Sequence, residues 1–240
     1  MPLDSAMNPV KKSQSLDEQA YQLIKQAIIQ CALPPGESVA ELRLASEMGI
    51  SKTPIRKAMA RLHQEGFLDN VPYRGYSVAE ISVQDVAEVY QLRQILECYL
   101  VTETALHFSL AELDEIEQLI DKSDAALASG APADYVEFNR EFHRTFARKS
   151  GSQRIADILR NLEEHVRRII LYVVQSGDDD LLDNQRDDHR QILMALREGD
   201  VAQATSMMRI HLSSFATTLV SRLQTRQSLA GTDQATTAAE

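Results

Sequence analysis

The sequence predicts a mainly α-helical protein, in which an N-terminal winged helix-turn-helix domain precedes an all-α antiparallel bundle of about six helices. Apolar residues recur at helical spacing along nearly the whole chain. Turn residues separate these helical segments. Strand-like alternation is confined to residues 67–80, directly after a helix that begins with hydroxyl and cationic side chains. The 240 residues suffice for one large domain or two smaller ones.

The first domain is expected over residues 15–80, preceded by a disordered segment over 1–14. Pro and Gly in LPPGE end the first helix, and Gly49 separates the next two. Ser51 or Thr53 is placed to cap the third helix. The predicted elements are helices at about 16–31 and 40–48, a third helix ending near Glu65, and two short strands within 67–80 around a turn with Pro72 and Gly75.

The second domain is expected over residues 81–225 and is helical throughout. Its breaks fall at SGAP, KSGS, SGDDD and EGD, which are rich in turn residues. The polar, small-residue tail over 226–240 is predicted to be disordered. The expected helices span about 83–108, 111–129, 133–149, 152–175, 181–198 and 200–224.

Composition is that of a soluble globular protein, with 44% hydrophobic and 25% charged residues. No apolar run approaches the roughly 20 residues that a membrane helix needs, and the N-terminus lacks the apolar region of a secretory signal. Cys31 and Cys98 have no metal-ligand spacing and are expected to be reduced thiols. These features predict a cytoplasmic protein without a membrane partner.

The net charge of −10 is unevenly distributed along the chain. Residues 1–80 hold nine basic and nine acidic residues, whereas residues 81–240 hold 16 basic and 26 acidic ones. Between positions 52 and 61 there are four cations and no acid. Because local charge governs phosphate contact, the acidic total does not exclude a nucleic-acid partner.

The third helix begins with SKTPIRKAMARL, which is typical of a recognition helix that enters the major groove N-terminus first. Thr53 and the helix N-terminus suit phosphate oxygens, while Lys52 and Arg56 can reach guanine O6 and N7. The alternative is a solvated helix start in a protein that never meets DNA. The candidate DNA-binding residues are Ser51, Lys52, Thr53, Arg56 and Lys57, with Arg74 and Gly75 at the tip of the wing.

Three histidines lie along apolar stripes of three separate predicted helices. His143 adjoins a row of three Phe residues, with Asn139 one turn earlier; His189 begins an i, i+3, i+4, i+7 apolar pattern, and His211 lies among Met and Phe residues. Neutral imidazole is the commonest metal ligand, and three with one oxygen donor suit Zn²⁺ or a similar ion with an open position. The alternative is three core histidines, each hydrogen-bonded to a carbonyl or hydroxyl. His63, His107 and His165 are expected to be structural.

The segment ELRLASEMGISKTPIRKAMARLHQEGFLDNVPYRGYSV closely resembles the winged-helix domain of GntR-type bacterial transcription regulators. Their usual pattern is LA-x-x-LG(V/I)SRTPVREAL-x-x-L-x-x-EG, followed by a P-x-RG wing. The resemblance extends from about residue 16 to residue 80, and the helical remainder resembles the FadR-type effector-binding domain (FCD). It implies a homodimeric repressor that binds a pseudo-palindromic operator in double-stranded DNA and releases it when a small molecule, expected to be an organic acid, binds the helical domain.

Two positions depart from the family pattern. Lys52 stands where the family usually has Arg, so a point charge replaces a bidentate fork and the base preference is expected to shift. Leu42 stands where some relatives carry a DNA-contacting Arg, and that contact does not transfer to neighbouring Arg43.

The resemblance to FCD domains implies a metal set of Asn139, His143, His189 and His211. The expected ion is a divalent transition metal, Zn²⁺ first, with Ni²⁺ or another ion as alternatives. Asn139 offers a neutral carbonyl oxygen where many relatives offer a carboxylate, which weakens charge compensation. Two residues are candidate effector contacts, Arg93, whose alternative role is an ion pair with Glu97 at i+4, and Arg186, one turn before His189.

No enzymatic activity is predicted. The Glu-x-x-His pairs of di-iron bundles are absent, as are GxSxG, P-loop and HExxH strings. Two alternatives remain open at this point: a metal-dependent enzyme, or a helical interaction module, carrying a DNA-tethering domain.

Overall fold

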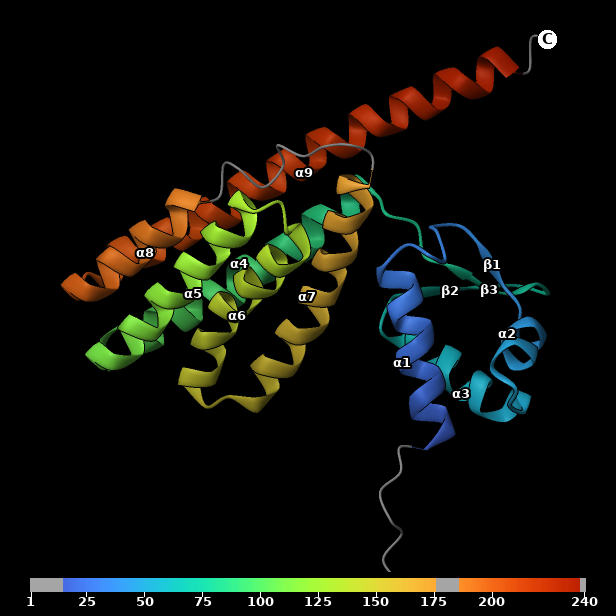
Figure 1. Cartoon of the computed structure of the whole chain (residues 1–240), viewed down its shortest axis with the longest axis horizontal. Coiled ribbons are helices and arrows are strands. Elements are labelled where there is room, and N and C mark those ends of the chain that lie inside the picture. The colour runs from blue at the N-terminus through green and yellow to red at the C-terminus, as the bar shows by residue number, and fades with distance from the viewer. Residues whose placement is uncertain (1–14, 176–185, 238–240) are drawn as a thin grey trace, which may run out of the picture. The chain divides into compact units, whose positions relative to one another are not determined.

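A computed structural model describes residues 15–175 and 186–237, and it confirms the mainly helical fold with a small N-terminal sheet (Figure 1). The chain divides into two compact units. Unit 1 comprises Met1–Ile28 with Ala32–Glu80, and unit 2 comprises Ile29–Cys31 with Ile81–Glu240. No helix of the described residues is long and apolar enough to cross a membrane.

Unit 1 is a winged helix-turn-helix. Its three strands are antiparallel in the order β1-β3-β2, with Asn70 opposite Tyr76 in the β2–β3 hairpin. Strand β1 is only two residues long, too short to give an alternating pattern from which the sequence could predict it. The elements are α1 (Leu16–Ile29), β1 (Ser38–Val39), α2 (Glu41–Met48), α3 (Lys52–Gln64), β2 (Leu68–Val71) and β3 (Gly75–Val78).

The turn at Gly49 and the buried face of α3 fix the exposure of the α3 N-terminus. Gly49 has φ +65°, the left-handed conformation that glycine adopts without strain, and its N–H donates to carbonyls of α2. Ile55, Met59 and Leu62 are fully buried on one face of α3. Only this stripe of the 13-residue helix packs against the core. The other side of its first turn is therefore exposed and can contact a partner.

Unit 2 is the expected helical bundle. Capping boxes at Ser82 and Ser109 fix where the first two helices begin. The most extensive interhelical contact runs between the first helix and the last, and Figure 1 shows these two lying along each other. The helices are α4 (Val83–Thr104), α5 (Leu110–Ala128), α6 (Pro132–Ser150), α7 (Gln153–Val174), α8 (Arg186–Glu198) and α9 (Val201–Thr237).

Two helix boundaries differ from the expectation, and a third falls among residues that are not described. Helix α4 ends at Thr104 and is followed by a 3₁₀ turn over Ala105–His107. Residues 181–185, expected to begin the fifth helix of the bundle, lie outside the described part. The sequence predicts that the last helix ends near residue 224, with a disordered tail over 226–240; α9 instead continues to Thr237. That segment contains one Gly and no Pro, so nothing in it forces the helix to stop.

The core of unit 2 contains charged side chains. Arg93 and Glu97 are buried on α4 among apolar neighbours, and Glu163 and Arg168 are buried on α7. Since charged groups are almost never fully buried unless they are paired or bind an ion, these residues direct attention to the middle of the bundle.

Candidate metal centre and nucleic-acid interface

His143 of α6, His189 of α8 and His211 of α9 converge in the core of unit 2. Nε2 of His211 lies 3.3 Å from Nε2 of His143 and 3.2 Å from Nε2 of His189. All three side chains are buried, and one ligand atom of each lies within 4.8 Å of the others. Among the described His, Cys, Asp and Glu residues, this is the group that could hold a metal ion.

Two of the distances between these nitrogens match those of a coordination sphere. Zn–N bonds of about 2.0–2.1 Å at tetrahedral angles separate two ligand nitrogens by about 3.3–3.4 Å. The Nε2–Nε2 distances of 3.2 and 3.3 Å agree with that separation. A hydrogen bond explains each of these contacts only if one of the two nitrogens carries a hydrogen.

Carboxylates hold the far side of two of the rings. Nδ1 of His143 lies 2.5 Å from Oε2 of Glu97, and Nδ1 of His211 lies 3.3 Å from Oδ2 of Asp188. A carboxylate only accepts, so in both rings Nδ1 donates and the Nε2 lone pair is left facing the cluster. This carboxylate–histidine arrangement is the usual support of a metal-binding imidazole.

Burial keeps the three rings neutral. It lowers the pKa of His143, lowers that of His189 well below its usual value, and lowers that of His211 to about 4. At His211 the hydrogen bond to Asp188 partly opposes this effect on the pKa. Neutral imidazole is the form that binds a metal, so the residues present fit a divalent transition ion without proton release at neutral pH.

The other predicted residues of this centre lie as follows. Asn139 is half-buried on α6, one turn before His143. Arg186 is the first residue of α8, but its side chain lies outside the described part. Arg93 is buried, and its Nε donates to Oε1 of Glu97 over 2.7 Å, so the ion pair that the i+4 spacing offers as an alternative is present.

Glu97 supports a candidate metal ligand, His143, and sequence reasoning misses this contact. Its spacing to Arg93 points to an ion pair, but no spacing rule connects it with His143, 46 residues later. Asp188 is missed for the same reason, because no spacing rule connects it with His211, 23 residues later. The expected structural histidines include His63 and His107, whose Nδ1 atoms each lie near a backbone carbonyl oxygen.

The predicted DNA-binding residues of α3 lie together at its exposed N-terminus. Ser51 is the N-cap residue, but its side chain makes no capping hydrogen bond, which leaves the hydroxyl available to a partner. The side chains exposed at this end of α3 are Ser51, Lys52, Thr53, Arg56 and Lys57.

The wing is the turn between β2 and β3. Arg74 and Gly75 are exposed there, and Gly75 has φ +88°. Tyr73 also has a positive φ, +64°, and its side chain is fully exposed. The left-handed backbone at Tyr73 and Gly75 turns the chain tightly and displays Arg74 at the tip.

Arg56 differs from the other cations of this interface because an acid of α2 holds it. Its Nε donates to Oε1 of Glu41 over 3.1 Å, and its Nη2 donates to Oε2 over 3.0 Å. Arg43, from which no DNA contact is expected, is instead paired with Glu37 over 2.7 Å.

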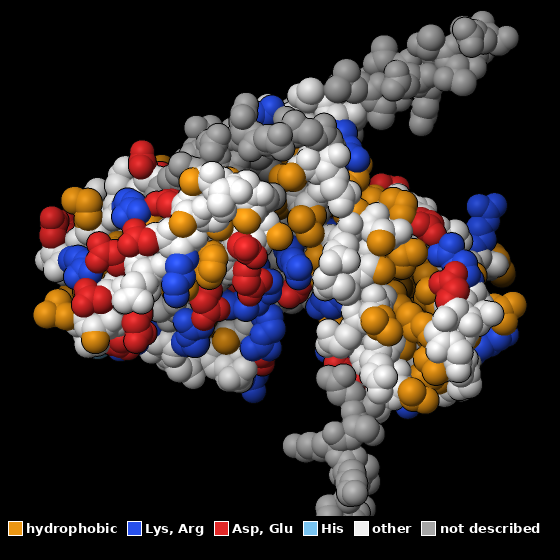
Figure 2. All heavy atoms as spheres, in the orientation of Figure 1, with side chains coloured by type: hydrophobic (Ala, Val, Ile, Leu, Met, Phe, Trp, Pro, Cys, Tyr) orange, Lys and Arg blue, Asp and Glu red, His pale blue; other side chains and the backbone are white. Residues whose placement is uncertain are grey.

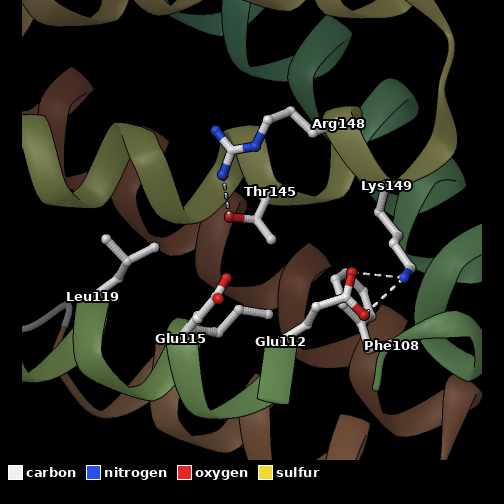
Figure 3. Close-up of a pocket in the computed structure, with 8 residues that line it drawn as sticks. Phe108, Glu112, Glu115, Leu119, Thr145, Arg148 and Lys149 are labelled. Carbon is white, nitrogen blue, oxygen red and sulfur yellow. Dashed lines mark hydrogen bonds and ion pairs between the residues drawn. The ribbon is translucent and has the colours of Figure 1, made fainter. Parts of the chain in front are cut away.

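A separate hollow of about 270 Å³ lies between α5 and α6 on the surface of unit 2 (Figure 3). Both of its cations are held by acids: Lys149 donates to both oxygens of Glu112, and Arg148 donates to Thr145 and forms an ion pair with Glu141. Acidic and basic side chains are likewise interspersed over the bundle face in Figure 2. This hollow therefore presents no concentrated charge to a ligand.

Comparison with known proteins gives two family matches. The FCD domain matches residues 88–214, and the bacterial regulatory proteins of the gntR family match residues 16–78. The chain is 24% identical over 217 residues to the HTH-type transcriptional repressor RspR of Escherichia coli (strain K12), covering 90% of this chain and 92% of RspR. It is 26% identical over 198 residues to an uncharacterized HTH-type transcriptional regulator, YdhC, of Bacillus subtilis (strain 168), covering 81% and 87%.

Solved structures share the fold. E. coli McbR/YncC superposes with a TM-score of 0.73 at 21% identity, covering 88% of this chain and 100% of that one. A putative GntR transcriptional regulator from Rhodococcus sp. RHA1 gives a TM-score of 0.70 at 20% identity, covering 85% and 97%. At these identities the likeness concerns the fold alone.

Proposed function

Since this chain belongs to the GntR family of bacterial transcriptional regulators that carry an FCD domain, we propose that it is a dimeric, metal-containing repressor that releases its operator when an organic acid binds unit 2. It is a regulator rather than an enzyme, as its named relatives are. The FCD architecture fits the FadR subfamily. RspR, which aligns over 90% of the chain, is named a repressor, and this supports the sign of regulation. Because such a repressor acts on chromosomal DNA, we expect it in the cytoplasm.

The observation that carries the effector site is the convergence of three Nε2 atoms in the buried core of unit 2. A divalent ion held by His143, His189 and His211 would act there as a Lewis acid and bind a carboxylate oxygen. Asn139, one turn before His143, would add its carbonyl oxygen. The buried Arg93–Glu97 pair brings a cation to the same region, next to the ring of His143.

The DNA site is the exposed start of α3 together with the wing. Ser51, Thr53 and Lys57 would bind phosphate oxygens, which fixes the orientation of the domain. Lys52 and Arg56 would reach base edges in the major groove. Arg74 and Gly75, at the tip of the wing, would contact the neighbouring groove or the phosphate backbone of the DNA. The dimer would have two arrangements, of which only one places its two recognition helices in successive major grooves. An effector that binds the other arrangement more tightly would therefore release the operator.

Dimerisation is supported by an exposed apolar stripe on α4. Four large hydrophobic side chains lie on one side of that helix and its 3₁₀ extension at spacings of three, four and seven residues, and each is about half exposed or more. Contiguous exposed apolar surface marks an interaction site. A second copy of the chain is the partner that a two-fold operator requires. The stripe consists of Leu92, Ile95, Tyr99 and Leu106.

The proposal is tested with untagged protein purified without a chelator. We expect about one transition ion per chain by elemental analysis, and sequence-specific binding to DNA from upstream of its own gene in a gel-shift series. The His189→Ala and His211→Ala variants should lose the ion and the response to organic acids but keep DNA binding. Arg56→Ala should lose operator affinity and remain a folded dimer. An absence of sequence preference at every salt concentration would contradict the proposal.

A further inference from the structure

We propose that Glu41 is a positioning residue for DNA recognition, which holds Arg56 of the recognition helix in one orientation and thereby increases sequence selectivity. The inference rests on the proposed DNA-binding function. Its basis is the two-pronged ion pair in which Nε and Nη2 of Arg56 donate to the two carboxylate oxygens of Glu41, over 3.1 and 3.0 Å. The pair joins the first residue of α2 to α3 across 15 residues of chain.

Arg56 is distinguished by this pair from the other cations of the interface. Lys52, Lys57 and Arg74 are exposed and have no ion-pair partner within the described ranges, 15–175 and 186–237. These three charges are therefore free to approach phosphates. Arg56 is neutralised by its acid, although its side chain is 68% exposed, so its contribution to simple phosphate attraction is reduced.

The geometry of the guanidinium determines what Arg56 can still do. Arginine has five N–H donors in a planar fork, and Glu41 takes one from Nε and one from Nη2. Three donors remain, and two of them lie on the Nη1–Nη2 edge, which the carboxylate leaves free. A free arginine loses rotamer entropy when it is immobilised on a partner. Glu41 pre-orders the side chain before DNA arrives, so less entropy is lost on binding a base.

The carboxylate also acts against the wrong sequences. Like charges repel, so an acid beside the groove disfavours any register in which a phosphate approaches Arg56. Correct guanine edges accept from the free side of the fork and leave the ion pair intact. The same residue therefore favours the specific complex and weakens the non-specific one.

The competing explanation is that Glu41 only joins α2 to α3. An exposed ion pair contributes little to stability. In that case its removal would slightly destabilise unit 1 and would change binding to all DNA sequences by the same factor. Selectivity, rather than affinity, is the quantity that separates the two explanations.

The experiment selects duplexes from a random pool with the full-length protein and three variants, Glu41→Gln, Arg56→Ala and Glu47→Gln. Glu47 is the matched control because it lies on the same helix and is more exposed, and its ion-pair contact is with Arg43 rather than with α3. Circular dichroism and gel filtration establish that each variant is folded.

We expect Glu41→Gln to lose the base preference at the same position of each half-site that Arg56→Ala loses. A good bidentate base contact discriminates strongly against the wrong base, so the operator-to-random affinity ratio should fall at least about tenfold. Affinity for random duplex should stay the same or rise. Glu47→Gln should keep the wild-type profile. In a double variant, Glu41→Gln should add little to Arg56→Ala, because the two residues act as a unit.

The inference is overturned if Glu41→Gln keeps the base preference that Arg56→Ala loses, or if operator and random affinities change by the same factor. A wild-type protein that enriches no sequence at all would instead overturn the proposed DNA-binding function, and this inference with it.

Discussion

Oε2 of Glu97 lies 2.5 Å from Nδ1 of His143, and both side chains are buried. The other oxygen of Glu97 accepts from Nε of Arg93 over 2.7 Å. One carboxylate thus fixes the tautomer of a candidate metal ligand and compensates a buried cation at the same time. Burial by itself raises the pKa of this carboxyl, but Arg93 and His143 together outweigh that effect and lower the pKa to about 2.

Replacing Glu97 by Gln should weaken metal binding. The amide is a weaker acceptor than the carboxylate, so Nδ1 of His143 is held less firmly and the ring is less basic. Loss of such a supporting residue typically costs about 10–100-fold in metal affinity. The measurement is a competition titration of Zn²⁺ against a chromophoric chelator, with Glu103→Gln, on the exposed side of the same helix, as the control. Equal affinities in the two variants would assign Glu97 to the ion pair alone.

Helical periodicity is sufficient to predict most of the fold and the three histidines. A buried stripe repeats every three or four residues, so the sequence alone places His143, His189 and His211 on inward faces of their helices. Boundaries without a local signal escape prediction. Nothing in the sequence marks where α9 ends, and β1, only two residues long, makes its pairing through the non-local partner β3.

The supporting residues of both sites could not be predicted from spacing. Glu97 meets His143 and Glu41 meets Arg56 because the helices that carry them cross, and crossing geometry is a tertiary property. Arg93 shows that a spacing rule can give the partner of a residue but not its burial. Its i+4 partner is visible in the sequence, but only burial shows that this pair lies in the core.

Replacing Asn139 by Asp should tighten metal binding if Asn139 is the fourth ligand. A carboxylate adds a negative charge to a site whose three other ligands are neutral, and we expect a gain of at least about tenfold, or 1.4 kcal/mol. The same chelator titration measures it. Gln118→Glu adds an equal charge at an exposed position of α5 and should have no effect. If both variants bind equally, Asn139 does not coordinate the ion.

The metal-free protein should lose stability between about pH 7.5 and pH 5. Burial lowers the pKa of His211 to about 4, whereas the unfolded chain titrates near its ordinary value of 6.5. Below about pH 6.5 the unfolded state binds more protons than the folded state, so the free energy of unfolding falls as the pH decreases. His211 should contribute about 2 kcal/mol to this loss. His143 and His189, whose pKa values are also lowered by burial, should add to it in the same direction.

Urea unfolding in excess chelator measures this pH dependence. The His211→Gln variant should lose part of it, because glutamine does not titrate. His107→Gln is the control, since His107 is exposed and lies on the 3₁₀ turn. A wild-type stability that is constant over this pH range would show that the histidines are not held neutral.

The apolar stripe on α4 should carry the dimer contact. Replacing Ile95 by Glu puts a charge in the middle of that stripe, where a second copy of the chain would desolvate it. Because burying an unpaired charge is costly, the dimer should dissociate to monomer at micromolar concentration. Sedimentation velocity measures the change. Leu110→Glu is the matched control, because Leu110 is an equally large and even more exposed side chain at the start of α5. Dimers of equal stability in both variants would place the contact on another face, and operator affinity should then survive Ile95→Glu unchanged.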